Sequence, residues 1–218
     1  MEYAKFMDYG VVVEAPIAFN GGNKSGPNNV SLPAPTASTV RGVVRRILGK
    51  WECRYTVLST AILHLGGEYP CTTNELKSFP KDQFDPKDQH TTRTNVNLVD
   101  VKYLFRVRLE VKPRDASDTL AKYHAMFTRR IRRGQVWGHH PSLGPAQNFC
   151  SVRFPEKGEV LTPIPLNQNL GIQPFDQDFS DPQHPWYYYP MVVANGVVDY
   201  PSWEEVKRFG LSRKGFNQ

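Results

Sequence analysis

The clearest alternation of apolar and polar positions lies at residues 99–111, where every odd-numbered residue is apolar and most even-numbered residues are polar. This period of two predicts a half-buried strand with one polar face. β-Branched and apolar runs at 9–19 and 53–64 predict two further strands, and residues 147–154 predict a fourth.

Two other segments have apolar residues at a helical period. At 36–50 and at 117–133 the apolar positions recur three and four residues apart, so each segment is predicted to be a helix with one buried face. Ser117 or Asp118 is placed to cap the second helix. Gly42 lies inside the first helix, where its cost relative to Ala suggests a close backbone approach.

The resulting order of elements is β-α-β, β-α-β. This is the order of the ferredoxin-like, split βαβ fold, so the predicted class is α+β with this domain at 1–154. Two polar stretches interrupt the order. Residues 20–35, rich in Gly, Pro and Asn, are predicted to form a loop, and residues 66–98 a long loop of a kind that is usually functional or disordered.

Residues 155–218 are rich in proline and are predicted to form a small C-terminal antiparallel β extension. Strands are expected around 186–193 and 195–200. The dipeptide Asn195-Gly196 favours a tight hairpin turn between them.

Composition limits the classes of protein that fit. The 218 residues include 39% hydrophobic and 22% charged residues, which argues against a disordered or fibrous chain. Three cysteines without a CxxC pair argue against a disulfide scaffold and fit a cytoplasmic protein. The chain has no apolar run long enough for a membrane span, and its first residues lack the apolar core of a signal peptide.

The net charge of +6 is compatible with a polyanionic partner, and the basic residues are concentrated in two clusters. One cluster lies at 41–54 and the other at 129–133. Arginine guanidinium groups match phosphate oxygens, so these clusters are candidates for nucleic-acid binding. The alternative is that they are solvated helix faces, and the pattern alone leaves both open.

No motif for nucleotide hydrolysis or for the common hydrolases is present. His139 and His140 are adjacent, and adjacent residues of an extended segment point to opposite sides. No Asp, Glu or Cys has ligand spacing relative to them, so neither a metal site nor a cofactor is expected.

Three stretches resemble the CRISPR-associated Cas family five of the RAMP superfamily, in its subtype I-C branch. Residues 33–47 (PAPTASTVRGVVRRI) resemble the start of the family's first helix, and residues 93–103 (RTNVNLVDVKY) its Arg-led entry into a strand. Residues 121–144 (AKYHAMFTRRIRRGQVWGHHPSLG) resemble its segment AKHxxMFxRRxxxGQCFxxPYLG, which is the most specific match.

This resemblance implies an RNA-recognition-like domain that grips the 5′ handle of CRISPR RNA (crRNA) and caps a Cascade effector. Residues 66–98 would form the family's thumb. The implied partners are crRNA or its precursor, the backbone-forming subunit and the large subunit, with target DNA reached only through the complex. In the I-C branch the protein also cuts the precursor RNA without a metal.

The resemblance also implies where cutting would take place. The branch has a Tyr in the first helix and a Lys-His pair that opens the second. Here Leu48 aligns with that Tyr, Lys122 is kept, and Tyr123 occupies the His position with His124 one place further on. On a helix this shift turns a side chain by about 100°. The candidate catalytic residues are Lys122, Tyr123 and His124, with the alternative that Tyr123 packs in the core and His124 lies at the surface.

The changed positions favour a protein that binds RNA without cutting it, or cuts it weakly. A metal-independent endoribonuclease and an RNA-binding module outside CRISPR systems are the alternatives. The candidate RNA-binding residues are basic or aromatic. They are Arg41, Arg45, Arg46, Arg93, Arg129, Arg130, Arg133, Trp137, His139 and His140.

Overall fold

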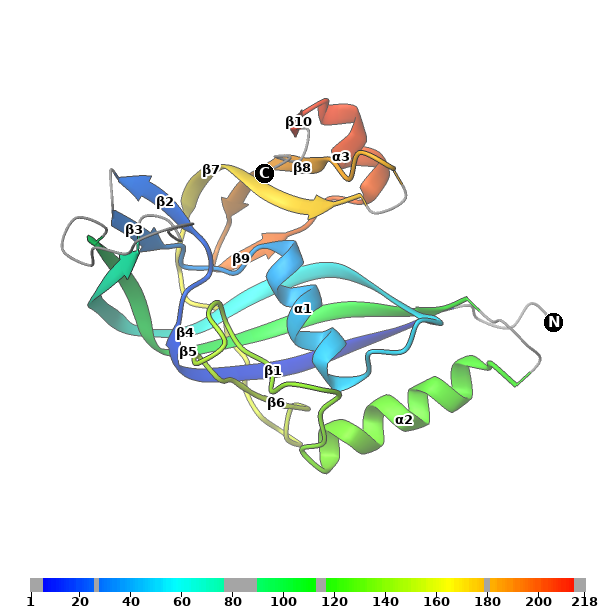
Figure 1. The fold of residues 1–218 in the computed structure, drawn as a ribbon. Coiled ribbons are helices and arrows are strands. Elements are labelled where there is room, and N and C mark those ends of the chain that lie inside the picture. The colour runs from blue at the N-terminus through cyan, green and yellow to red at the C-terminus, as the bar shows by residue number, and fades with distance from the viewer. Residues whose placement is uncertain (1–5, 26–27, 77–89, 113–116, 179–180, 214–218) are drawn as a thin grey trace, which may run out of the picture.

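A computed structural model describes residues 6–25, 28–76, 90–112, 117–178 and 181–213, and it confirms the ferredoxin-like order. The elements of this body are β1 (Phe6–Ala18), α1 (Ala37–Ile47), β4 (Cys53–Leu76), β5 (His90–Val111), α2 (Leu120–Arg132) and β6 (Ser151–Arg153). Its strands lie in the order β4-β5-β1-β6, each antiparallel to its neighbour. Both helices cover the same face of this sheet (Figure 1).

The period-two pattern of β5 positions the core. Tyr103, Phe105 and Val107 are fully buried, and β1 places Val11 directly opposite Phe105. A slip of one residue would bring the polar face of β5 into the core, so the alternation fixes the strand register. The helix faces predicted from sequence pack on this core, through Val40 and Val44 of α1 and through Phe127 of α2.

The expectation of a loop over 66–98 is wrong for most of that range. β4 and β5 stay paired from Cys53↔Val111 to Leu76↔His90, and residues 77–89 lie outside the described residues. Threonine explains the difference, because it is polar yet β-branched and suits a strand exposed on both faces. Thr72 and Thr94, for example, share a cross-strand hydrogen bond of 3.0 Å between their hydroxyl oxygens. We call this paired extension the arm (residues 66–76 and 90–98).

The predicted loop at 20–35 also contains strands. β2 (Gly22–Ser25) and β3 (Asn28–Ser31) form a hairpin, and β3 runs parallel to β5. Buried Asn20 anchors the hairpin, donating hydrogen bonds to Leu32 O and to the Tyr103 hydroxyl at 3.1 and 2.8 Å.

The C-terminal residues form a second, antiparallel sheet over α1 (Figure 1). It consists of β7 (Gln168–Gln177), β8 (Trp186–Val193) and β10 (Ser212–Arg213). The Asn195-Gly196 turn is confirmed by positive φ angles of 49° and 75°. The strands it joins nevertheless separate, because β9 (Val197–Asp199) pairs with β4 of the main sheet.

Helix α3 (Trp203–Phe209) is not predicted by the apolar pattern. The helix is too short for its apolar residues to show a helical period, but both of its ends have residues that are typical of helix caps. Ser202 and Glu205 form a reciprocal capping box, and Gly210 ends the helix in the left-handed conformation with φ 65°. Its Val206 joins a core that also contains residues of the ferredoxin-like body. Within the described residues, no helix is long and apolar enough to cross a membrane.

Candidate functional site

The first turn of α2 carries the three candidate catalytic residues. The turn begins at Thr119, whose side chain accepts a hydrogen bond of 3.2 Å from the backbone N–H of Lys122. The expectation that Ser117 or Asp118 caps the helix is therefore wrong. This places Asp118 just before the helix, where its side chain is only 7% exposed.

Tyr123 points into the core and is 3% exposed. Its hydroxyl donates a hydrogen bond of 2.5 Å to Asp118 Oδ1. Burial and then this hydrogen bond raise the pKa of Tyr123. The side chain thus occupies the apolar stripe of α2 between Leu120 and Phe127, as the alternative interpretation expected.

His124 turns the other way, towards β1. Its Nδ1 lies 2.8 Å from the hydroxyl of Tyr9, a residue that sequence reasoning missed. Tyr9 is buried against Phe127, with ring centroids 4.7 Å apart. Burial raises the pKa of Tyr9 to about 12, so the hydroxyl keeps its proton. The hydroxyl donates to Nδ1 of a neutral His124 ring, whose hydrogen is then on Nε2, and it accepts from the Nδ1–H of a protonated ring.

Lys122 supplies a cation on the same helical turn. Its side chain is 43% exposed, and its Nζ lies 3.1 Å from Asp118 Oδ1. Asp118 therefore holds both Lys122 and Tyr123 through one oxygen. The result is a tethered ammonium group and a half-buried imidazole, His124, on one helical turn. The two residues are two positions apart, so they flank Tyr123 on opposite sides of it.

Neither Leu48 nor Cys53 adds a nucleophile to this site. Leu48, which aligns with the family's Tyr, is fully buried. Burial raises the pKa of the Cys53 thiol to about 12, so it stays protonated and is a poor nucleophile. Within the described residues, no group of three or more His, Cys, Asp or Glu side chains is arranged to hold a metal ion.

The fold brings the two basic clusters together. Arg130 of α2 donates a hydrogen bond of 2.8 Å to Ile47 O, at the end of α1. The backbone N–H of Trp137 donates to Arg46 O at 2.6 Å, and the Trp137 ring covers Gly49. A Cβ on Gly49 would lie 2.0 Å from that ring, so only glycine allows this contact. Trp137 remains 42% exposed.

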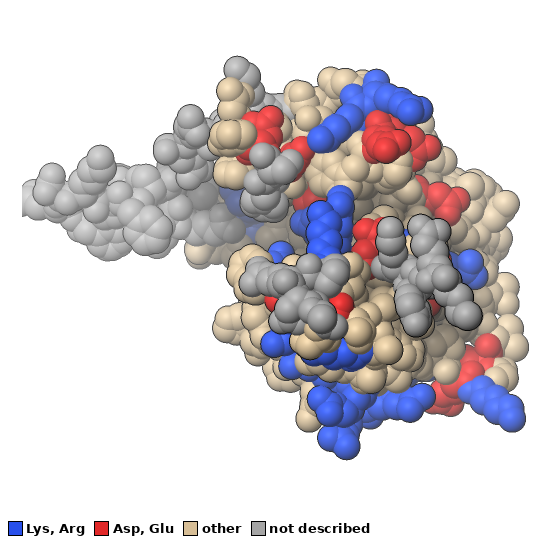
Figure 2. Space-filling view, turned by 90° about the vertical axis from the view of Figure 1, so that its right-hand side faces the viewer, with Lys and Arg blue, Asp and Glu red and all other residues tan. Residues whose placement is uncertain are grey.

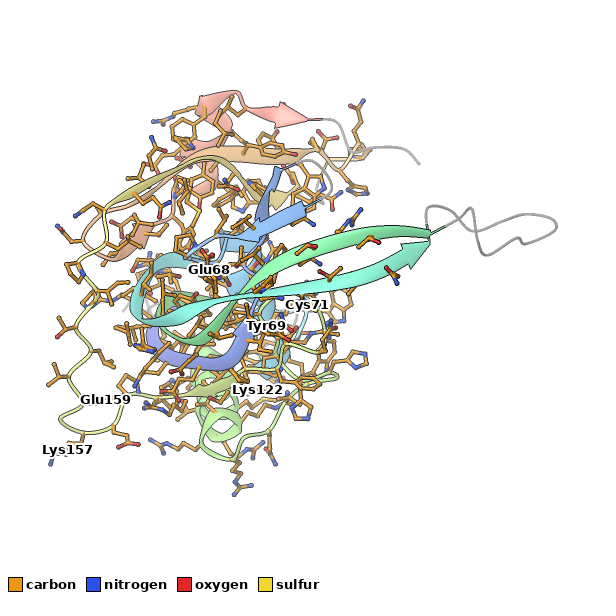
Figure 3. All side chains as sticks on the ribbon, turned by 90° about the vertical axis from the view of Figure 1, so that its left-hand side faces the viewer. Glu68, Tyr69, Cys71, Lys122, Lys157 and Glu159 are labelled. Carbon is orange, nitrogen blue, oxygen red and sulfur yellow. The ribbon has the colours of Figure 1, made fainter. Side chains whose placement is uncertain are left out.

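The candidate RNA-binding residues differ in what they contact. Arg41 is engaged in an ion pair with buried Asp176 of β7, and Arg130 binds a helix carbonyl, so both have structural roles. The remaining candidates lie at the surface. They are Arg45, Arg46, Arg129, Arg133, Trp137, His139 and His140, with Arg93 on the arm. The arm projects far from the body, as Figure 3 shows.

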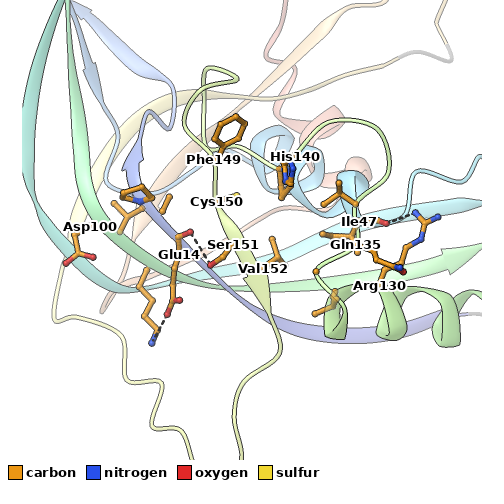
Figure 4. A pocket seen from close by; sticks show the side chains of 18 of the residues that line it. Glu14, Ile47, Asp100, Arg130, Gln135, His140, Phe149, Cys150, Ser151 and Val152 are labelled. Atoms are coloured by element: carbon orange, nitrogen blue, oxygen red, sulfur yellow. Dashed lines mark hydrogen bonds and ion pairs between the residues drawn. The ribbon is translucent and has the colours of Figure 1, made fainter.

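A cavity of about 790 Å³ lies beside the segment that follows α2 (Figure 4). Arg130, Gln135 and His140 line it together with Phe149, which is 57% exposed and 5.8 Å from the His140 ring. The cavity therefore brings together two of the candidates, Arg130 and His140. Trp137 and His139 do not line it.

Comparison with known proteins places the chain in a family. No family model matches it. The CRISPR pre-crRNA endoribonuclease Cas5d of Thermus thermophilus is 37% identical over 158 residues, covering 72% of this chain and 67% of that protein.

Two solved structures share the fold, each with a TM-score of 0.67 over 92% of this chain. One is a CRISPR-associated protein, 20% identical and covered over 94% of its length. The other is the functionally uncharacterized protein SMU1763c from Streptococcus mutans, 17% identical and covered over 95%. Because the sequence similarity to the Thermus protein extends over most of both chains, this chain belongs to the Cas5d family of CRISPR-associated proteins.

Proposed function

We propose that this chain binds crRNA as a subunit of a Cascade-like effector and cuts the precursor of that RNA at the first turn of α2. The relative from Thermus thermophilus is named as a pre-crRNA endoribonuclease. The observation that carries the proposal is the hydrogen bond between His124 Nδ1 and the Tyr9 hydroxyl, on the same helical turn as Lys122. It gives the shifted histidine a defined orientation.

Cleavage by this site would use the 2′-hydroxyl of the RNA as the nucleophile. The 2′-oxygen forms a bond to the adjacent phosphorus, and the bond from phosphorus to the 5′-oxygen breaks. The reaction needs a base for the 2′-hydroxyl proton, an acid for the leaving oxygen and a cation for the charge of the phosphorane. The proton of the 2′-hydroxyl passes to solvent water. His124 acts as the imidazolium: its Nδ1–H donates to the Tyr9 oxygen, and its Nε2–H passes to the departing 5′-oxygen, which leaves a neutral ring. Lys122 stabilises the phosphorane. The products are a 2′,3′-cyclic phosphate and a 5′-hydroxyl.

Asp118 and Tyr9 act as positioning residues. Asp118 holds the Lys122 ammonium group near the helix N-terminus until a phosphate competes for it. Tyr9 fixes the His124 ring by accepting from the Nδ1–H of the protonated imidazole, so that the Nε2–H is the proton available to the RNA. We assign Tyr123 to the core rather than to proton transfer, because its hydroxyl is buried against Asp118.

RNA binding by the same subunit would use the basic surface where α1 and α2 end. The proposed partners are the 5′ handle of crRNA, the backbone-forming subunit and the large subunit, with target DNA contacted only through the assembled complex. We propose that the subunit acts in the cytoplasm. No cofactor is part of the proposal.

The test is incubation of the purified chain with labelled repeat RNA in the presence of EDTA, read on a denaturing gel. We expect discrete cutting by the wild type, with cutting lost in His124→Ala and Lys122→Ala. His64→Ala is the matched control, since His64 is an exposed histidine on β4 outside the proposed machinery. Cutting that survives His124→Ala contradicts the assignment.

A second candidate function is binding without cutting. Leu48 favours it, because a buried aliphatic side chain replaces the family's tyrosine and brings no polar group to the site. A tight, salt-sensitive RNA complex with no product in the same assay would support this alternative. Family membership favours either of these roles over an RNA-binding module outside CRISPR systems.

A further inference from the structure

A second cavity, of about 560 Å³, lies between α1, the start of β4 and the C-terminal sheet. This is within the size range of small-molecule sites, which is roughly 300–1,000 Å³. Its wall carries side chains from all three regions, and six of them are basic. They are Arg41, Arg45, Lys50, Arg54, Lys112 and Lys207. The C-terminal sheet and α3 together form what we call the C-terminal lobe. Figure 2 shows basic side chains in the hollow between this lobe and the body beneath it.

Two of these cations are neutralised within the fold. Arg41 pairs with Asp176, and Lys207 Nζ lies 2.9 Å from Asp178 Oδ2. In the part of the chain that the structure describes, the other four basic residues of the wall form no ion pair. Four positive charges around one hollow repel one another, and a ligand with several negative charges would relieve this repulsion.

The cavity also has an aromatic wall. Trp51, in the turn between α1 and β4, is 74% exposed, well above the 42% of Trp137. The Arg45 guanidinium carbon lies 5.9 Å from the centre of the Trp51 ring. An exposed indole beside arginines is the combination with which proteins stack nucleic-acid bases and hold the adjoining phosphates.

The cavity borders the proposed cleavage site. Cys53 lines the cavity at the start of β4, and it lies close enough to Tyr9 and Asp118 that, in addition to burial, it raises the pKa of Tyr9 and has its own pKa raised by Asp118. Figure 2 views the side of the molecule on which both the hollow and the beginning of α2 lie. One RNA strand is therefore able to reach both places without passing around the molecule.

We propose that this cavity binds a nucleotide of the RNA strand that flanks the cleaved bond, with its base on Trp51 and its phosphates on Arg45, Lys50, Arg54 and Lys112. The identity of the strand rests on the proposed function. The size of the cavity suits single-stranded RNA, whose bases are free to stack, rather than a duplex. An aromatic ring and several cations would also recognise a free nucleoside triphosphate. The experiment below distinguishes this ligand from an RNA strand.

The experiment measures the dissociation constant of the full chain for a fluorescein-labelled repeat RNA that carries a 2′-deoxy residue at the cut, which prevents cleavage. Trp51→Ala is expected to weaken binding about tenfold, since removal of one base stack costs about this much. Trp51→Phe retains a ring and is expected to recover most of the affinity. Trp51 is exposed, so neither change removes core packing.

The charges are tested through the dependence of affinity on salt. Each phosphate that a variant no longer neutralises should lower the slope of log K against log salt by about 0.7. Lys50→Ala, Arg54→Ala and Lys112→Ala are each expected to show this decrease. Lys157→Ala is the matched control, because Lys157 lies on an exposed loop at the opposite end of the molecule from the C-terminal lobe (Figure 3).

Failure of this proposal is distinguishable from failure of the proposed function. Wild-type affinity in Trp51→Ala and in all three charge variants overturns the cavity assignment, even if the chain cuts RNA. A chain that never cuts but depends on Trp51 for RNA affinity supports the cavity and contradicts the nuclease. Trp51-dependent binding of ATP that repeat RNA does not displace overturns the RNA assignment in favour of a free nucleotide.

Discussion

At the scale of single residues, the proposed chemistry depends on a contact between side chains that are 115 positions apart. Tyr9 occupies a buried position in the alternation of β1, where a tyrosine needs a partner for its hydroxyl. His124 is that partner, and the contact turns the imidazole away from Tyr123 and towards the sheet. The catalytic orientation of His124 is therefore set by β1 rather than by its own helix.

Replacing Tyr9 with phenylalanine tests this orientation. Tyr9→Phe is expected to slow single-turnover cleavage of repeat RNA at saturating protein by about 10- to 100-fold, a part of what a general acid contributes. RNA affinity should change little, because Tyr9 is buried. An unchanged cleavage rate in a variant of normal melting temperature would show that Tyr9 serves packing alone.

Sequence reasoning finds the charged and titratable candidates but not their partners. Lys122 and His124 are visible on the first turn of a predicted helix, whereas Tyr9 resembles one more apolar residue of a strand. Arg41 is a candidate for RNA binding because its neighbours are basic. Its actual partner, Asp176, is 135 residues away, and only the folded chain brings that carboxylate to α1.

At the scale of elements, two glycines have opposite roles, one in the middle of α1 and one just after it. Gly42 is exposed, and a Cβ there would meet nothing within 4 Å, so the expectation of a close approach is wrong. Gly49 is the position of close approach, under the Trp137 ring. The local sequence contains both glycines and does not distinguish them. The residue that covers Gly49 is Trp137, which lies 88 positions further along the chain.

Alanine substitutions at these two glycines should therefore change the free energy of unfolding in opposite directions. Gly42→Ala is expected to raise the free energy of unfolding by about 0.5–1 kcal/mol, because alanine loses less entropy in a helix. Gly49→Ala is expected to lower it by about 1–3 kcal/mol, since the new methyl group must displace Trp137. Denaturation in urea measures both. Equal effects of the two substitutions would contradict the packing described for Trp137.

The arm shows a further limit of sequence patterns. Its residues alternate weakly because both faces of the strands are polar, so hydrophobic period does not identify them as strands. The cross-strand hydrogen bonds from Thr92 Oγ1 to Asn74 and between Thr72 and Thr94 replace apolar packing along the arm. The pattern of β5 at 99–111, in contrast, predicts its strand correctly because one of its faces is buried.

At the scale of the whole molecule, the C-terminal sheet is tied to the ferredoxin-like body by polar contacts around a shared core. The Tyr200 hydroxyl donates to Pro35 O at 2.6 Å, and Arg41 pairs with Asp176. β9 adds directly to the main sheet. The predicted division at residue 154 remains a prediction, but these contacts make the two parts interdependent.

The Arg41–Asp176 pair provides a test of this interdependence. Arg41→Ala leaves a buried carboxylate without its partner and is expected to lower the free energy of unfolding by about 2–4 kcal/mol. Adding Asp176→Asn should restore part of the stability, because the amide needs no counter-charge. Arg129→Ala, a change at the surface of α2, is the control. If Arg41→Ala lowers the free energy of unfolding no more than Arg129→Ala does, the Arg41–Asp176 pair does not stabilise the attachment of the C-terminal sheet.

A second ionic network should make stability depend on pH. Arg153 hydrogen-bonds to Glu159 at 2.7 Å and holds the pKa of that carboxyl well below its ordinary value of 4.5. A group with a depressed folded-state pKa stabilises the fold above its unfolded pKa and loses this effect as pH falls through the folded one. The melting temperature of the wild type should therefore fall more steeply between about pH 5 and pH 3 than that of Glu159→Gln. If the melting temperatures of the wild type and of Glu159→Gln fall in parallel over this pH range, the Arg153–Glu159 pair does not stabilise the fold.

The assignment of His124 as the general acid is tested most directly with an RNA in which sulfur replaces the 5′-oxygen that leaves at the cut. A thiolate leaves without protonation, so removal of the acid no longer matters. His124→Ala should be inactive on normal repeat RNA yet cut the sulfur-containing RNA at nearly the wild-type rate, with EDTA present. Lys122→Ala should stay slow on both substrates, because its charge stabilises the phosphorane in either case. If His124→Ala remains equally slow on the sulfur-containing RNA, or cuts normal RNA like the wild type, His124 is not the general acid and the account of this site is wrong.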